Sequence, residues 1–224
     1  MTKLQKAYRE TGGLSKPSKM PCYSWGIPAQ TCRRAKQLMI DEPDSICGKC
    51  YAMSGAYNWN VVKDAYARRY DSWKRLPNRE WVNYMVTILD SNKVKSKGYF
   101  RWFDSGDIQS LSMIYQLIEI AERTPDIKHW VATREYIDIT MSMTEYIPSN
   151  MVFRLSHTNI DEIDEVISHT AKSKGVQQSV VISTDDIKLT PKQYTCPSMK
   201  THGKCADCRA CWNSKVEQVA YVLH

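Results

Sequence analysis

Residues 98–190 alternate short apolar runs with segments in which apolar residues recur every three or four positions. Short apolar runs are typical of buried strands, and the three-to-four spacing is typical of amphipathic helices. The pattern predicts strands at residues 99–104, 129–133, 151–156 and 179–183, and helices at residues 111–122, 139–146 and 160–173. In the first helix of this series, for example, Leu111, Ile114 and Ile118 share one face.

The flanking regions have weaker patterns. Residues 1–20 are predicted to form a polar arm, and residues 21–50 a loop punctuated by proline and glycine. A short strand at residues 22–27 would lead into this loop, and a last strand is predicted at residues 219–223. Helices are predicted at residues 50–76, interrupted at Gly55, and at residues 80–89.

Alternating strands and helices favour a parallel sheet with crossover helices. Counting the two flanking strands gives about six, which is too few for a complete eightfold barrel. We therefore predict one α/β domain over residues 1–224, built as a partial (β/α)6 TIM-like barrel.

Small polar and charged residues follow the predicted strands, at the edge where parallel α/β folds carry their chemistry. The candidate ligand-binding residues are Ser105, Gly106, Asp107, Thr133, Arg134 and His157. Each functional interpretation has a structural alternative. Asp107 would suit a helix N-cap, Arg134 an ion pair with a nearby carboxylate, and His157 a structural hydrogen bond.

The bulk composition narrows the class of protein. Net charge is +7, from 31 basic and 24 acidic residues, which is mild for 224 residues. Such a surface permits contact with nucleic acid, although a solvated basic surface explains it equally simply. No apolar run approaches the length of a membrane span, and the N-terminus has no apolar signal-peptide core. We expect no membrane partner and a cytoplasmic location, where cysteine thiols stay reduced.

Seven of the eight cysteines fall into two groups that lie near the two ends of the chain. The first is Cys32, Cys47 and Cys50, and the second is Cys196, Cys205, Cys208 and Cys211. Thiols gathered in this way in a reducing compartment indicate metal-binding loops. The overlapping C-x2-C steps of the second group favour a [4Fe-4S] cluster over zinc, which commonly uses two separate C-x2-C pairs. His202 would be an alternative ligand there.

Three cysteines in the first group leave one metal coordination position free, which is the mark of a catalytic centre. Two alternatives remain open. Cys22 would close the first site if it were a fourth ligand, and cysteines from both ends would form one cluster if they met.

Three cysteines after a first strand, followed by a partial βα barrel, resemble the radical SAM superfamily. The fourteen-residue gap between Cys32 and Cys47 is similar to the variant spacing of the 7-carboxy-7-deazaguanine synthases. Ser105-Gly106-Asp107 lies where that superfamily has a Gly-Gly-Glu motif that holds the methionine amino group. The resemblance implies an oxidoreductase or lyase that uses S-adenosylmethionine, a small-molecule substrate and an electron donor.

The chain as a whole resembles more closely the phage gene product 88 family of uncharacterised proteins. The matching segments are Cys47-x2-Cys50-Tyr51-Ala52, Phe100-Arg101-Trp102 through Ser105-Gly106-Asp107, Thr133-Arg134, and Cys205-x2-Cys208-Arg209-Ala210-Cys211-Trp212. A phage origin would place the protein in the host cytoplasm.

The leading hypothesis is therefore an iron–sulfur protein with an open [4Fe-4S] site and an auxiliary C-terminal cluster, acting as a radical-SAM-like enzyme. One alternative is a non-catalytic iron–sulfur electron carrier or binding module. The other is a zinc-stabilised protein that binds nucleic acid. The substrate and reaction, the oligomeric state and the number of clusters are not fixed by the sequence.

Overall fold

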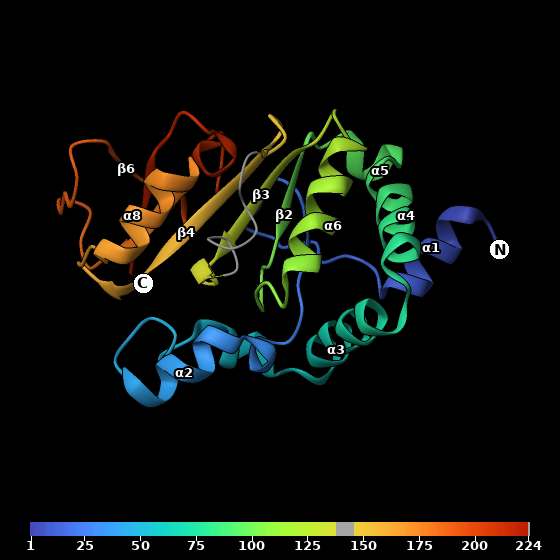
Figure 1. Ribbon diagram of the computed structural model, residues 1–224, viewed down its shortest axis with the longest axis horizontal. Coiled ribbons are helices and arrows are strands. Elements are labelled where there is room, and N and C mark those ends of the chain that lie inside the picture. The colour runs from blue at the N-terminus through green and yellow to red at the C-terminus, as the bar shows by residue number, and fades with distance from the viewer. Residues whose placement is uncertain (138–145, 224) are drawn as a thin grey trace.

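A computed structural model describes residues 1–137 and 146–223 and has a mixed α/β architecture (Figure 1). Seven strands form one sheet in the order β1-β2-β3-β4-β5-β7-β6, and every neighbouring pair is parallel. Their bounds are β1 Tyr23–Trp25, β2 Tyr99–Trp102, β3 Lys128–Thr133, β4 Met151–Ile160, β5 Gln177–Ile182, β6 Gln193–Thr195 and β7 Gln218–Val222. The parallel α/β sheet expected from the alternating pattern is confirmed.

The sheet is open, with β1 at one edge and β6 at the other. The finer expectation of a TIM-like barrel is not confirmed, because the edge strands do not pair. The strand that the hydrophobic pattern missed is β6, a three-residue edge strand whose central Tyr194 is exposed. A strand this short buries too little apolar surface to leave a periodic signal.

The helices are α1 Lys3–Thr11, α2 Arg33–Asp41, α3 Asn60–Arg75, α4 Asn78–Leu89, α5 Asn92–Lys95, α6 Leu111–Glu122 and α8 Glu165–Lys174. Helix α6 has the predicted bounds. The helix predicted at residues 160–173 starts later, because Ile160 ends β4 and pairs with Val181. The helix predicted at residues 139–146 falls on residues 138–145, which lie outside the described part of the chain.

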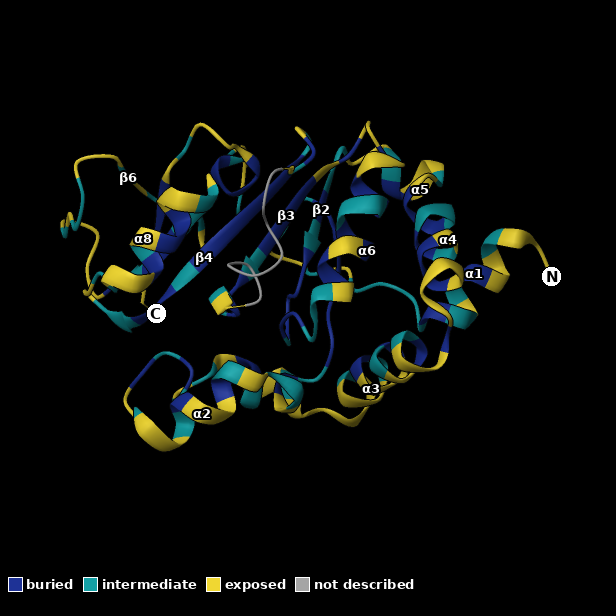
Figure 2. Ribbon diagram, viewed as in Figure 1, coloured by how far each residue is buried: buried dark blue, intermediate teal, exposed yellow. Residues whose placement is uncertain are grey.

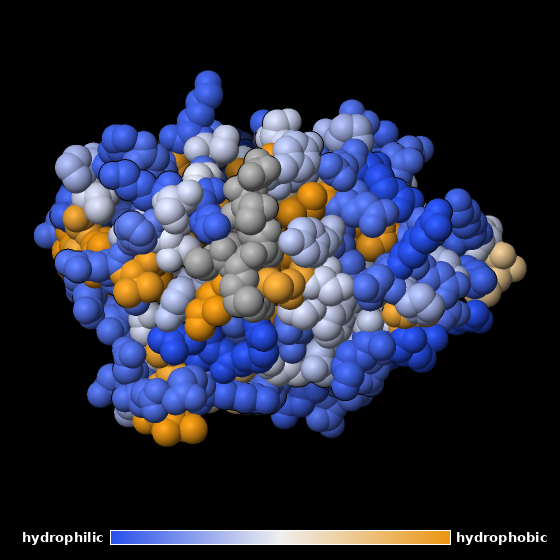
Figure 3. All heavy atoms as spheres, viewed as in Figure 1, coloured by the Kyte–Doolittle hydropathy of each residue, from blue (hydrophilic) through white to orange (hydrophobic). Residues whose placement is uncertain are grey.

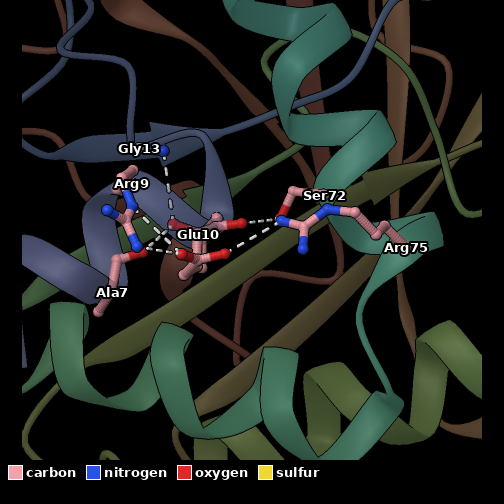
Figure 4. A network of polar contacts seen from close by, with 7 residues as sticks. Ala7, Arg9, Glu10, Gly13, Ser72 and Arg75 are labelled. Carbon is pink, nitrogen blue, oxygen red and sulfur yellow. Dashed lines mark hydrogen bonds and ion pairs between the residues drawn. The ribbon is translucent and has the colours of Figure 1, made fainter.

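The expectation of a polar arm over residues 1–20 is wrong, because α1 packs onto the domain. Thr2 and Gln5 form a capping box at its start, and Ala7 is fully buried in the main core. At its end, the Ser72 hydroxyl donates to the Glu10 carbonyl, and Arg75 Nη2 lies 3.2 Å from Glu10 Oε2 (Figure 4). Small buried residues such as Ala7 give little hydrophobic signal in a sequence, so this helix was overlooked.

The two faces of the sheet are covered differently, since successive side chains of a strand point to opposite sides. On the helix face, Phe100, Trp102 and Phe153 form the main core with residues of α4, α6 and α8. Figure 2 shows these helices buried toward the sheet and exposed outward. On the opposite face, which we call the loop face, Trp130 and Val219 pack against the C-terminal cysteine segment.

The outer surface is mainly hydrophilic, and apolar residues show only in separate patches on the side seen in Figure 3. Within residues 1–137 and 146–223, no helix is both long and apolar enough to cross a membrane.

Candidate metal centres

Cys32, Cys47 and Cys50 converge beside α2. Cys32 directly precedes the helix, and Cys47 is buried against Ala35 and Leu38 of the same helix. Burial is the largest cause of the raised pKa of Cys32, and Asp107, Cys50 and Cys47 raise this pKa further. The structure thus places the three cysteines of the first group within electrostatic reach of one another. We call them the N-terminal thiol group.

Backbone hydrogen bonds fix this segment to the carboxyl edge of the sheet. The Ile46 amide donates to the Thr158 carbonyl at 3.1 Å, and the Ile27 amide donates to the Ser105 carbonyl at 3.0 Å. Figure 1 shows α2 below the end of β4. The N-terminal thiol group therefore lies at the edge where the strands end.

Ser105, Gly106 and Asp107 form the turn that meets this segment. Gly106 has a φ of +79°, and a Cβ atom there would lie 2.8 Å from the Ile27 carbonyl oxygen. Only glycine fits this close backbone approach without strain. The turn therefore brings Asp107 near the N-terminal thiols by direct packing of two loops.

Asp107 is not the N-cap of α6, because Ser110 takes that role by accepting from the Met113 amide. The Asp107 carboxylate instead accepts from the Ile108 amide at 2.7 Å and from the Arg134 amide at 2.8 Å. Burial raises the pKa of Asp107 to about 7, against the opposing effect of these hydrogen bonds.

Thr133, Arg134 and Glu135 follow β3 at the same edge. The Thr133 hydroxyl accepts from the Glu135 amide at 3.0 Å, and the Glu135 carboxylate pairs with Arg33 at 3.1 Å. Arg134 does not use its guanidinium on Glu135. It donates to the His157 carbonyl, and its charge lowers the pKa of Cys47 against the larger effect of burial. A cation and two carboxylates thus surround the N-terminal thiol group.

The side chain of His157 is not brought to this group. Its Nδ1 accepts from the Asp164 amide at 2.9 Å, and its Nε2 lies 2.8 Å from Gln178 Oε1. Both ring nitrogens are engaged between β4, β5 and α8, and burial lowers the pKa of the imidazole. This arrangement matches the structural alternative, a histidine held by internal hydrogen bonds.

Cys196, Cys205, Cys208 and Cys211 lie over the loop face, where Cys22 joins them. Cys22 and Cys211 belong to one buried cluster, against which Cys196 and Cys208 pack. Burial raises the pKa of Cys22 to about 12, and the nearby Cys205 contributes to this rise. Burial also raises the pKa of Cys205, and Cys196 and Cys208 raise it further. We call these five the C-terminal thiol group. Cys22 thus lies with the other end of the chain and does not complete the N-terminal group.

Arg154, in the middle of β4, holds the C-terminal loop in place. Its guanidinium is fully buried and donates to five backbone carbonyls at 2.8–3.2 Å, those of Ala210, Cys211, Asn213, Val216 and Gln178. The Cys211 thiol also lies 3.2 Å from the Tyr221 hydroxyl of β7. One cation in the sheet therefore fixes the backbone that carries the cysteines.

The family model for gene product 88 matches residues 2–214, a span that contains both thiol groups. The chain belongs to the gene product 88 family. No curated protein and no solved structure matches it. The matched span ends just before β7, so the family match takes in six of the seven strands and all eight cysteines of this gene product 88 chain.

Within the described part of this gene product 88 chain, no group of three or more His, Cys, Asp or Glu side chains is arranged to hold a single metal ion. A four-iron cluster makes a different demand. It places iron and sulfide between its cysteines, so its ligand sulfurs stand farther apart than those around one tetrahedral ion. Cysteine thiolates are the donors that such a cluster uses.

Sequence reasoning missed Arg154 and the place of Cys22. A charged residue inside the apolar run Met151–Ile160 was the available signal for Arg154, because an arginine in a buried strand needs a dedicated set of acceptors. Cys22 carried no comparable signal, since its partners are more than 170 residues away in the chain.

Proposed function

We propose that this gene product 88 protein is an iron–sulfur protein with two centres. Cys32, Cys47 and Cys50 would hold an open [4Fe-4S] cluster. Cys196, Cys205, Cys208 and Cys211 would hold an auxiliary one, with Cys22 beside it. The observation that carries the proposal is the gathering of eight unpaired cysteines into two groups, three at the strand edge and five on the loop face.

The chemistry of the donor sets supports this assignment. Burial raises the pKa of Cys32 and brings that of Cys211 to about 11, so without a metal these thiols stay protonated at neutral pH. Metal binding would displace those protons and leave buried thiolates that need a cationic partner. Thiolate is the ligand that iron–sulfur clusters use.

The N-terminal centre would be the catalytic one, in a radical-SAM-like enzyme. Its free coordination position would face the Asp107 carboxylate, which accepts from the Arg134 backbone amide, and the Arg134 guanidinium, which donates to the His157 carbonyl. Such a pair suits the amino and carboxylate groups of an amino-acid-like ligand, and S-adenosylmethionine is the candidate. When bound, the cluster would supply one-electron chemistry. The protein groups would orient the ligand and hold its charges.

A non-catalytic electron carrier is the second candidate, and the position of the C-terminal group favours it. That group packs against Trp130 and Trp212 on the loop face, so its thiols are enclosed by the protein. A carrier needs no ligand pocket at all.

Anaerobic quantitation of iron and sulfide tests the proposal. We expect about eight irons per chain in the wild type, and about four in both Cys50→Ser and Cys208→Ser. S-adenosylmethionine added to the reduced protein should change the electron paramagnetic resonance signal that Cys50→Ser removes. Bound iron whose resonance signal does not respond to S-adenosylmethionine would favour the electron carrier over the enzyme. A colourless protein with stoichiometric zinc would contradict both.

A further inference from the structure

The loop face carries two buried N–H donors without a partner, close to the C-terminal thiol group. Arg101 of β2 and Trp130 of β3 both point to this face, and the Arg101 guanidinium lies over the Trp130 ring at 4.8 Å. Among the described residues, neither Arg101 Nε nor Trp130 Nε1 has a hydrogen-bond partner. A buried donor left without an acceptor costs about 1–3 kcal/mol. Trp25 and Trp81 of the main core have N–H groups that are likewise unpartnered within residues 1–137 and 146–223, so what singles out Arg101 and Trp130 is their place on the loop face beside the C-terminal thiols.

The remaining contacts of Arg101 place its charge between the two thiol groups. Its Nη1 donates to Met20 Sδ at 3.3 Å, and its Nη2 donates to the Phe103 carbonyl at 3.4 Å and to the Tyr51 hydroxyl at 3.5 Å. Tyr51 follows Cys50 directly in the chain. None of these partners is a carboxylate; the carboxylate whose charge acts on Arg101 is that of the buried Asp104, which raises the Arg101 pKa against the opposing effect of burial.

The charges around the two thiol groups have opposite signs. Arg101 and Arg209 lower the pKa of Cys22 and Cys205 against the larger effect of burial, and Arg154 does the same for Cys211. Around the N-terminal group, the carboxylates Asp107 and Glu135 raise the pKa of Cys32 in addition to burial. The C-terminal thiol group thus has cations around it. The N-terminal thiol group has carboxylates around it, and the positive charge of Arg134 offsets part of their negative charge.

The reduction potential of an iron–sulfur cluster depends on its net charge, on hydrogen bonds to its sulfurs and on solvent exposure. Reduction adds a negative charge, which nearby cations and N–H donors stabilise. An orphaned guanidinium N–H and an orphaned indole N–H are donors of the kind that sulfur atoms of a cluster would accept.

We propose that Arg101 and Trp130 donate hydrogen bonds to the sulfur atoms of the C-terminal cluster and, with the charge of Arg101, raise its reduction potential above that of the N-terminal cluster. This inference rests on the proposed iron–sulfur function and extends it. It assigns the C-terminal centre the role of electron acceptor within the pair, and Arg101 and Trp130 the role of positioning residues.

A potentiometric titration followed by electron paramagnetic resonance tests the inference. The full chain is used in a Cys50→Ser background, so that the C-terminal cluster alone contributes the signal. We compare Arg101→Gln, which removes the charge and the Nε donor, with Arg101→Lys, which keeps the charge but lacks Nε. Trp130→Phe removes only the indole donor and keeps an aromatic ring over the loop face.

Two matched controls come from the rest of the molecule. Trp81 is fully buried in the main core, and its Nε1 also has no partner within the described residues. Arg69 is a buried arginine that donates to the Gly13 carbonyl and to the Ser15 hydroxyl, away from the thiols. Trp81→Phe and Arg69→Gln therefore make the same chemical changes without touching the C-terminal group.

We expect Arg101→Gln to shift the midpoint to a more negative potential, with about a tenfold change in the ratio of oxidised to reduced cluster, or 59 mV for one electron. Arg101→Lys and Trp130→Phe should shift it in the same direction by less, and the two controls should leave it unchanged. In the wild-type chain, which keeps Cys50 and both clusters, the N-terminal cluster should titrate at a more negative potential than the C-terminal one.

The possible failures are distinguishable. A C-terminal cluster that assembles with four irons but keeps its midpoint in Arg101→Gln and Trp130→Phe would overturn this inference and leave the iron–sulfur function intact. Equal shifts in the Trp81→Phe or Arg69→Gln controls would overturn it too, because the effect would then be general. A chain that binds no iron at the C-terminal cysteines would overturn the inference together with the proposed function.

Discussion

The two thiol groups differ in how the fold holds them. Backbone contacts between loops fix the N-terminal group at the strand edge, where Gly106 allows a turn to touch Ile27. A buried guanidinium fixes the C-terminal group, and the backbone of that segment wraps around Arg154 on the loop face. The first arrangement keeps its thiols at the edge of the sheet. The second one encloses its thiols between the sheet and a loop.

On the proposed iron–sulfur function, this difference would separate two tasks that a pair of redox centres must perform. A centre that binds a ligand needs free coordination and nearby polar groups, as at Asp107 and Arg134. A centre that only exchanges electrons gains from enclosure, because burial and fixed cations set its potential. The comparison predicts that damage to one support should disturb one group and spare the other.

The largest effect is expected from Arg154→Met. The substitution leaves five buried carbonyls without their donor, and we expect a loss of about 4 kcal/mol in the free energy of unfolding. Alkylation followed by mass spectrometry should show faster labelling of Cys205, Cys208 and Cys211, while Cys47 keeps the wild-type rate. Arg154→Lys keeps the charge but has fewer donors, so its free energy of unfolding and its labelling rates should lie between those of the wild type and Arg154→Met. Equal acceleration at Cys47 would contradict separate supports.

Acid should act on both groups together, through the sheet they share. His129 of β3 is fully buried, with Trp102 Nε1 donating to its Nδ1 at 3.2 Å, and burial lowers its pKa to about 3. The unfolded chain, with a pKa of about 6.5, binds this proton first, so stability is complete above pH 6.5 and falls as the pH drops toward 3. By pH 4.5 the loss from this residue is about 3 kcal/mol.

Urea unfolding at pH 7 and pH 4.5 measures this loss. His129→Gln retains a donor and an acceptor but does not titrate, so its own acid-induced loss should be smaller than the wild-type loss by about 3 kcal/mol. Other carboxylates titrate in both proteins and cancel in this difference. Identical pH dependence in the two proteins would show that His129 is not the neutral buried group described here.

The sequence predicts those features of the fold that depend on a local pattern of residues, and it does not predict those that depend on contacts between distant segments. Helix α6 has the predicted bounds because its apolar residues keep helical spacing against a large core. Helix α2, with nine residues, lies inside the segment predicted as a loop. The prediction was wrong there because proline and glycine on both sides of the helix favour a loop. The cysteine groups themselves were predictable from spacing. The partners of Cys22 and the acceptors of Arg154 depend on contacts across the fold, which no local pattern encodes.

Gly106→Ala should disturb the N-terminal group alone. The new Cβ would meet the Ile27 backbone and occupy a left-handed conformation, with an expected cost of about 2–3 kcal/mol. Gly98→Ala is the matched control, because Gly98 has a similar φ of +67° and nothing within 4 Å. The control should cost about 1 kcal/mol. Faster alkylation of Cys32 and Cys47 in Gly106→Ala, with unchanged Cys211, would support the separation, and the reverse pattern would refute it.

The smallest effects are expected from removing one hydroxyl beside each group. Tyr51→Phe loses the hydrogen bond to the Asp104 carbonyl at 3.2 Å, and Tyr221→Phe loses the contact with the Cys211 thiol at 3.2 Å. Tyr51 is 57% exposed, so water replaces its partner and the loss should be about 0.5 kcal/mol. Tyr221 is more enclosed and should lose about 1 kcal/mol.

Thiol labelling distinguishes these two variants better than stability does. Tyr221→Phe should change the alkylation rate of Cys211, because it removes the only hydroxyl that the described residues place against that sulfur. Tyr51→Phe should change the rate of Cys50 instead, since it loosens the short helix that follows this cysteine. If both variants altered the same cysteines, the groups would be coupled through Arg101, which contacts Tyr51 and faces the C-terminal thiols.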